Sequence, residues 1–137
     1  MKASEQAAEI VDEFSFFDDW EDRYQHLIDM GRRLPPLEDK HKVEENRLRG
    51  CQSVVHFKAE YDAPVLRFHA GSDAAIVQGL IAVMLRVYSG QTPADIISTQ
   101  PDFLYQIGLD EHLSPTRKNG LASLVTAIMD AARRQQA

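Results

Sequence analysis

The spacing of apolar residues predicts helices in the first part of the chain. Apolar positions recur every three to four residues between residues 7 and 14, with acidic residues between them, which is typical of a short amphipathic helix. We expect a second helix to begin at Asp18, whose carboxylate can cap free backbone amides, with Glu21 placed as in a capping box. This helix should end at Leu34-Pro35-Pro36, because proline has no amide hydrogen to donate.

The period of the apolar residues changes to two after Ser53. Val55, Phe57, Ala59 and Tyr61 alternate with polar residues, which predicts a half-buried strand. Asp62-Ala63-Pro64 has the composition of a turn, and residues 65–70 predict a returning strand. Because an isolated hairpin is marginally stable in water, we expect a third strand, for which residues 45–48 are the best candidate.

The remainder of the chain predicts helices again. Residues 74–88 are apolar nearly all round, as in a central buried helix, with Ser72 as its expected cap. Thr92-Pro93 and Ser114-Pro115 each combine a capping residue with proline at the first helical position, and the second pair opens a long amphipathic final helix. The predicted fold is therefore α+β: a single two-layer domain over residues 1–137, with a three-stranded antiparallel sheet packed against helices.

Composition excludes several classes of protein. The chain has 137 residues, a net charge of −6 and a pI near 5.3, which disfavours a general nucleic-acid binder. The longest apolar helix is too short to span a membrane. One cysteine excludes an internal disulfide and a four-cysteine metal or iron–sulfur site, so we expect a free thiol in a reducing compartment. The N-terminal residues lack the pattern of a signal sequence, and we therefore expect a cytoplasmic protein.

The single cysteine, Cys51, is the main candidate for chemistry. Gly50 can adopt backbone angles closed to other residues and so permits a sharp turn that presents Cys51 at a loop tip. A thiol is a nucleophile as its thiolate, and Arg47, Arg49 and Arg117 could lower its pKa if they lie nearby. The alternative is a small buried side chain with no chemical role.

Two other functions are compatible with these residues. Cys51, His69 and Asp73 could in principle form a Cys-His-Asp hydrolase, although no local signature of such an enzyme is present. Alternatively, the chain could be a pure protein-interaction domain with an incidental cysteine. The five histidines form no HxxxH or HxH ligand pair, and there is no phosphate-binding loop, so we expect neither a metal nor a bound cofactor.

Several segments together resemble one known family. The segment Gly50-Cys51-Gln52-Ser53, within residues 46–55, resembles the cysteine loop of the SufE family of sulfur-acceptor proteins, which includes the CsdE branch. Further matching segments follow in the same order, at residues 71–82, 92–93, 112–117 and 120–121, and the helix from Asp19-Trp20 to Leu34-Pro35 has a family counterpart. The resemblance covers nearly the whole chain.

The resemblance implies a fold shared with IscU-type scaffolds and a role in iron–sulfur cluster assembly. Cys51 would accept sulfur as a persulfide from a pyridoxal-phosphate cysteine desulfurase of the SufS or CsdA type, stimulate that enzyme, and pass the sulfur to a scaffold complex or another acceptor. The family shelters this loop in the free protein and extends it on docking.

The resemblance also assigns further residues. Gly50 would be the hinge of the loop, and the positions that match family residues near it are Gln52, Ser53, Asp73 and Arg117. One departure is His56, where many members have tryptophan, and it affects the local packing or partner preference. With one cysteine the chain should carry sulfur without assembling a cluster itself. A homodimer is compatible with the sequence.

Overall fold

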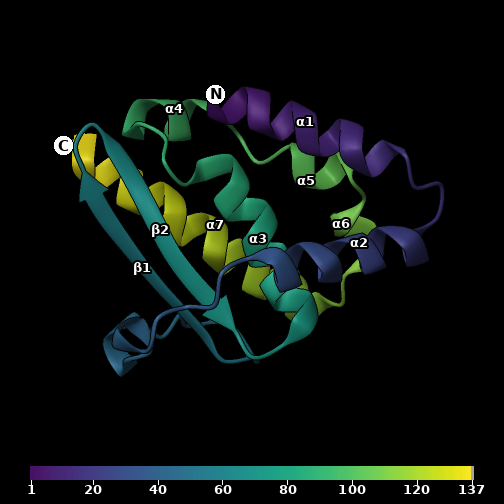
Figure 1. Cartoon of the computed structure of the whole chain (residues 1–137), viewed down its shortest axis with the longest axis horizontal. Helices are drawn as coiled ribbons and strands as arrows, with labels where there is room; N and C mark the ends of the chain where they lie inside the picture. The colour runs from purple at the N-terminus through teal and green to yellow at the C-terminus, as the bar shows by residue number, and fades with distance from the viewer. Residues whose placement is uncertain (137) are drawn as a thin grey trace.

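A computed structural model of the chain describes residues 1–136, which form seven helices, two short 3₁₀ turns and one hairpin. Figure 1 shows these elements in chain order. The first half contains α1 (Ala3–Ser15), α2 (Trp20–Arg33), η1 (Asp39–His41), η2 (Glu44–Asn46), β1 (Val55–Asp62) and β2 (Val65–Ser72). The second half contains α3 (Ala75–Tyr88), α4 (Pro93–Ser98), α5 (Phe103–Gln106), α6 (Leu109–His112) and α7 (Pro115–Gln136).

The sheet has two strands in the described part of the chain, so the prediction of a third strand was wrong. β1 and β2 pair antiparallel from Val55 opposite Ser72 to Asp62 opposite Val65, as the alternating pattern predicts. Residues 45–48 contribute only one bridge, between Arg47 and His56. The chain before Arg47 turns away from the sheet, because the Arg47 amide bonds to the Glu44 carbonyl within η2. Residues 44–47 are all polar and lack the alternation that would hold a strand on the sheet.

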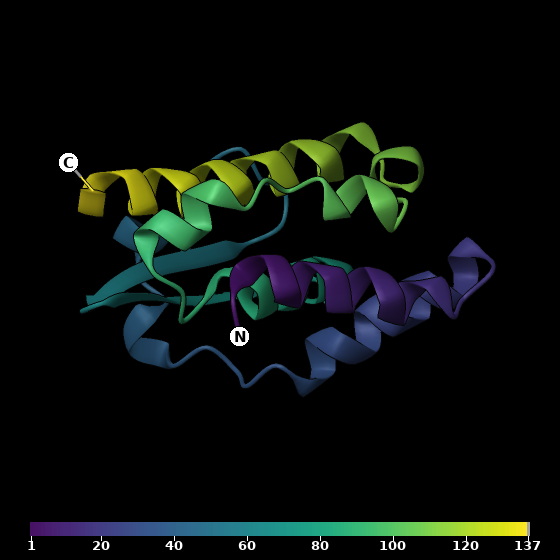
Figure 2. The ribbon, with the colours of Figure 1, turned by 90° about the horizontal axis from the view of Figure 1, so that it is seen from above.

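The α3 helix lies at the centre of the molecule, in contact with α1, α2, β2 and α7. Figure 2 shows α7 together with α4, α5 and α6 on one side of α3 and the hairpin, α2 toward the other side, and α1 overlapping α3 in this view. The side chains of α3 are buried nearly all round, including Ile81, Val83, Met84 and Val87. The apolar side chains of β2 also face this core. The sequence prediction of a central buried helix is confirmed.

Two predicted helix starts need correction, and two are confirmed. The side chain that caps α2 is Asp19, not Asp18, and it accepts a hydrogen bond from the Asp22 amide. Ser72 ends β2 rather than capping α3, whose N-cap is Ala74. Thr92 caps α4 as expected, and the Ser114 hydroxyl accepts a hydrogen bond from the Arg117 amide at the start of α7. None of the helices within residues 1–136 combines the length and hydrophobicity that a membrane span requires.

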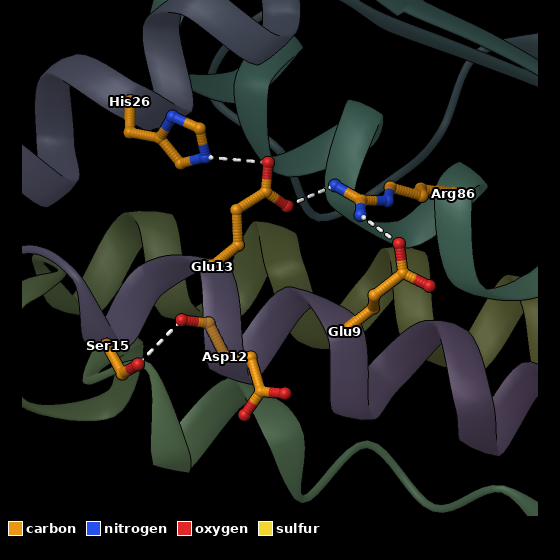
Figure 3. A network of polar contacts seen from close by, with 6 residues as sticks. All are labelled: Glu9, Asp12, Glu13, Ser15, His26 and Arg86. Carbon is orange, nitrogen blue, oxygen red and sulfur yellow. Dashed lines mark hydrogen bonds and ion pairs between the residues drawn. The ribbon is translucent and has the colours of Figure 1, made fainter.

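Ion pairs tie α1 to α3, and a histidine of α2 lies close to the same carboxylate of α1 (Figure 3). The Arg86 guanidinium on α3 bonds the Glu13 carboxylate on α1 and lies 3.5 Å from Glu9 Oε1. The second oxygen of Glu13 is 3.6 Å from Nε2 of His26 on α2, beyond hydrogen-bond distance. Burial lowers the pKa of His26, and the nearby positive charge of Arg86 acts in the same direction, while Glu13 opposes them. His26 is therefore a weaker base than a histidine exposed to solvent.

Candidate functional site

The cysteine loop consists of residues 50–54, between Arg49 and the start of β1. Its base is closed by the Leu48 amide, which donates to the Val55 carbonyl at 2.9 Å, beside the Arg47–His56 bridge. Gly50 has φ of +86°, a left-handed conformation that other residues rarely adopt. The predicted sharp turn before Cys51 is therefore present, and Cys51 follows directly at the tip.

The tip of the loop lies against the first turns of α7. The half-buried Cys51 thiol donates a weak hydrogen bond to the Gly120 carbonyl, with Sγ 3.9 Å from the oxygen. A Cβ atom added at Gly120 would lie 3.4 Å from Cys51 Sγ, and one added at Gly50 would lie 2.6 Å from Ser123 Oγ. Gly120 and Ser123 are three residues apart on one helix and so share a face. These two residues form the surface on which the loop tip rests.

A cavity of about 410 Å³ opens beside Cys51. Its walls are mainly apolar, with polar side chains of the cysteine loop and of the start of α7 at its margin. The lining residues are Leu48, Cys51, Gln52, Ser53, Val55, Val77, Leu80, Ile81, Ser114, Thr116, Arg117, Gly120, Leu121 and Leu124. No histidine and no carboxylate is among them, so the cavity offers the thiol neither a general base nor a second metal ligand.

Burial dominates the electrostatics of the thiol. It raises the pKa of Cys51, and the positive charge of Arg47 offsets this only in part. Arg49 extends away, 84% exposed and 3.5 Å from Glu44. Arg117 lines the cavity with an exposed side chain. The expected lowering of the pKa by three arginines is therefore not found, because one of them acts on the thiol and burial outweighs it.

The structure places the predicted site residues at two different cavities. Gln52, Ser53 and Arg117 line the Cys51 cavity. Asp73 lines a separate cavity of about 420 Å³, together with His56. That cavity lies between the end of α2 and the start of the hairpin, and Val54 connects its wall to the cysteine loop. Asp73 is distant from Cys51 in the sequence and follows Ser72, which pairs with Val55 at the end of the loop, but it does not line the cavity at the thiol.

The residues of the alternative Cys-His-Asp hydrolase are not brought together. The imidazole of His69 stacks on His41, with ring centroids 4.8 Å apart, and its Nε2 is 3.8 Å from Glu60 Oε2. Neither His69 nor Asp73 lines the cavity at Cys51. A nucleophile and its base must lie within hydrogen-bond reach, and this arrangement does not provide that. Within residues 1–136 no group of three histidine, cysteine or acidic side chains could hold a metal ion.

Two residues of the site were missed from the sequence, Gly120 and Ser123. One signal for Gly120 was available, because an isolated glycine within a helical pattern usually has a packing reason. No comparable signal marks Ser123 in the sequence, because its side chain meets Gly50 only once the chain has folded.

Comparisons with known proteins agree on one family. A family model described as "SufE: Fe-S metabolism associated domain" matches residues 8–132. An uncharacterized SufE-like protein of Rhizobium etli is 40% identical over 130 residues, covering 91% of this chain and 88% of that protein. A second, from Rhizobium meliloti, is 40% identical over 129 residues, covering 90% and 92%. The solution structure of a hypothetical protein from Thermus thermophilus matches with a TM-score of 0.77 at 21% identity, covering 94% of each chain, and so shares the fold.

Proposed function

This chain belongs to the SufE family, which is associated with iron–sulfur metabolism, and on that basis we propose that it is a sulfur-transfer protein with Cys51 as its persulfide acceptor. Its donor is a pyridoxal-phosphate cysteine desulfurase of the SufS or CsdA type, whose turnover it stimulates by removing sulfur. It has no independent turnover and no cofactor of its own.

The transfer is a thiol exchange that needs no external oxidant or reductant. The Cys51 thiolate attacks the outer sulfur of a persulfide on the desulfurase cysteine. A bond forms between Cys51 Sγ and that sulfur, the sulfur–sulfur bond of the donor breaks, and the donor cysteine leaves as a thiolate. The proton lost by the Cys51 thiol is taken up by the donor cysteine. The product is a Cys51 persulfide.

The observation that carries this proposal is a free thiol at a loop tip beside an apolar cavity that contains no general base. A hydrolase needs a base to activate its nucleophile and later a water molecule. Thiol exchange needs only thiolate and access to the sulfur of the partner. The cavity can shelter a second sulfur atom on Cys51 from soluble thiols while the protein is free.

We propose that the desulfurase contacts the chain around this loop. At the margin of the cavity Gln52 and Arg117 are exposed to a docking partner and Ser53 is half-buried, while Asp73 lines the second cavity. Gly50 is the hinge, since its left-handed conformation is open to few other residues. The recipient of the sulfur is a scaffold complex for iron–sulfur clusters or another acceptor, because one cysteine cannot hold a cluster.

Intact mass spectrometry tests the acceptor role. The protein is incubated with a desulfurase, pyridoxal phosphate and free cysteine, beside the Cys51→Ser variant. We expect the wild-type protein to gain one sulfur atom, to lose it on reduction, and the variant to gain none. No gain with a desulfurase that is active and binds the protein would refute the proposal.

A binding measurement separates transfer from mere interaction. Cys51→Ser should bind the desulfurase nearly as well as the wild type but no longer stimulate sulfide release. Stimulation that survives the loss of the thiol would support the interaction domain instead.

A further inference from the structure

Few hydrogen bonds hold the cysteine loop on the described part of the molecule. Its base is held by the Leu48–Val55 hydrogen bond. Among residues 1–136, the only hydrogen bond made by residues 50–54 is the weak one from the Cys51 thiol to the Gly120 carbonyl, at 3.9 Å. The tip also packs against Ser123, and Cys51 packs against the hydrophobic core. The position of the tip therefore depends on the surface of α7 below it.

The surface below the tip is rigid and closely fitted. The neighbouring residues Leu124 and Ile128 are 3% and 0% exposed, so α7 cannot shift away without disturbing the core. Gly120 leaves just enough space for the sulfur, since an added Cβ would already lie 3.4 Å from Sγ. Atoms beyond Cβ at this position would occupy the space of the sulfur itself. At position 123 a longer side chain would meet the backbone of Gly50, which has no side chain to move aside.

We propose that Gly120 and Ser123 are positioning residues that retain the Cys51 tip in its sheltered place, and that enlarging either one releases the loop and exposes the sulfur. This inference rests on the proposed function for its biological meaning, as the device that controls when the carrier can react. The exposure of the thiol itself can be measured without any sulfur transfer.

The test is the rate of Cys51 alkylation by iodoacetamide, followed by intact mass over a range of pH. Gly120→Leu and Ser123→Leu should each react on the order of tenfold faster than the wild type at neutral pH, because access and thiolate fraction both rise. Burial raises the pKa of Cys51 in the sheltered loop, so release should also move the midpoint of the pH–rate profile to lower pH. A purely structural role of the two residues would leave that midpoint unchanged.

Three variants serve as controls. Gly120→Ala and Ser123→Ala keep the fit within ordinary contact distance and should react at nearly the wild-type rate. Asn119→Leu adds the same side chain at an exposed position on the same turn of α7, outside the cavity lining. Far-ultraviolet circular dichroism and thermal unfolding establish that each variant is folded. Rapid alkylation in Gly120→Leu and Ser123→Leu, with slow alkylation in the three controls, supports the proposal.

Unchanged alkylation in both folded leucine variants would overturn it, as would equal acceleration in Asn119→Leu. The same proteins can then be loaded with sulfur by a desulfurase. If none of them gains sulfur although the alkylation rates differ as expected, the sulfur-transfer function fails while the role of Gly120 and Ser123 stands.

Discussion

Replacing Gly79 by alanine should destabilise the protein by forcing α2 and α3 apart. A Cβ atom at Gly79 would lie 2.3 Å from the Leu27 carbonyl oxygen and 2.7 Å from its carbon. Both are backbone atoms of α2, so neither can rotate away. Restoring ordinary contact at 3.4 Å requires the helices to separate by about 1 Å, in a region where Leu27 is fully buried.

The expected net loss is about 2 kcal/mol. Overpacking against backbone costs about 3 kcal/mol, at the upper end of the usual range. Replacing glycine by alanine within a helix stabilises that helix by about 1 kcal/mol through its higher intrinsic propensity. Gly120→Ala is the matched control, because its new Cβ would make only an ordinary 3.4 Å contact with Cys51 Sγ. That variant should be neutral or more stable by up to about 1 kcal/mol.

Urea denaturation followed by the fluorescence of Trp20 measures these effects. Trp20 is the only tryptophan, and its ring stacks on His112 at 4.5 Å, so its emission should change on unfolding. Gly31→Ala gives a second test, because its Cβ would lie 2.7 Å from the Gly79 amide nitrogen at the same crossing. Once the helices have separated for one alanine, the second costs less, so the double variant should lose clearly less than the sum of the single losses. Equal stability of Gly79→Ala and Gly120→Ala would refute this reasoning.

Three further predictions concern stability. Since burial lowers the pKa of His26 in the folded state, the unfolded chain binds the additional proton first as pH falls below about 6.5, so stability should decline with falling pH in that window and His26→Phe should flatten the profile in urea titrations. Tyr88→Phe should lower the free energy of unfolding by about 1 kcal/mol, measured by thermal unfolding. The hydroxyl of the fully buried Tyr88 donates to the Thr99 carbonyl at 2.7 Å, and without it this carbonyl has no hydrogen-bond donor. No loss of stability would mean that water replaces the hydroxyl. Asp19→Ala should cost about 1 kcal/mol while Asp18→Ala costs little, and the reverse order would contradict the observed cap of α2.

The parts of the fold that were predictable are those with a strong period. The alternation that starts at Val55 predicted the hairpin, although Tyr61 on its apolar face is exposed, and the continuous apolar run around Ile81 identified α3 as central. The hydrophobic pattern could not predict individual contacts between residues. The segment before Cys51 joins the sheet through one bridge at Arg47, and a period cannot be read from one residue. The sequence pattern could not decide between Asp18 and Asp19 as the cap of α2, because either residue could precede the first turn of the helix.

The candidate site shows the same division. The presentation of Cys51 after Gly50 followed from the turn chemistry of glycine, and the positive φ of Gly50 agrees with it. The raised pKa of Cys51 did not follow, because burial against α7 depends on how a distant helix folds back onto the loop. For the same reason the sequence did not reveal that Asp73 and Cys51 line different cavities, since these cavities exist only in the folded chain.

In the proposed function, accepting sulfur and carrying it place opposite demands on Cys51. Attack on the donor requires an accessible thiolate, whereas safe transport requires protection from soluble thiols. The contact of the loop with Gly120 would suit transport, because burial both covers the thiol and raises the pKa of Cys51. A partner that lifts the tip from α7 removes both obstacles together, so loop release should limit the rate of sulfur acceptance. The folded Gly120→Leu variant should then accept sulfur at least as fast as the wild type and lose its persulfide faster to dithiothreitol; slower loss would contradict a sheltering role for this contact.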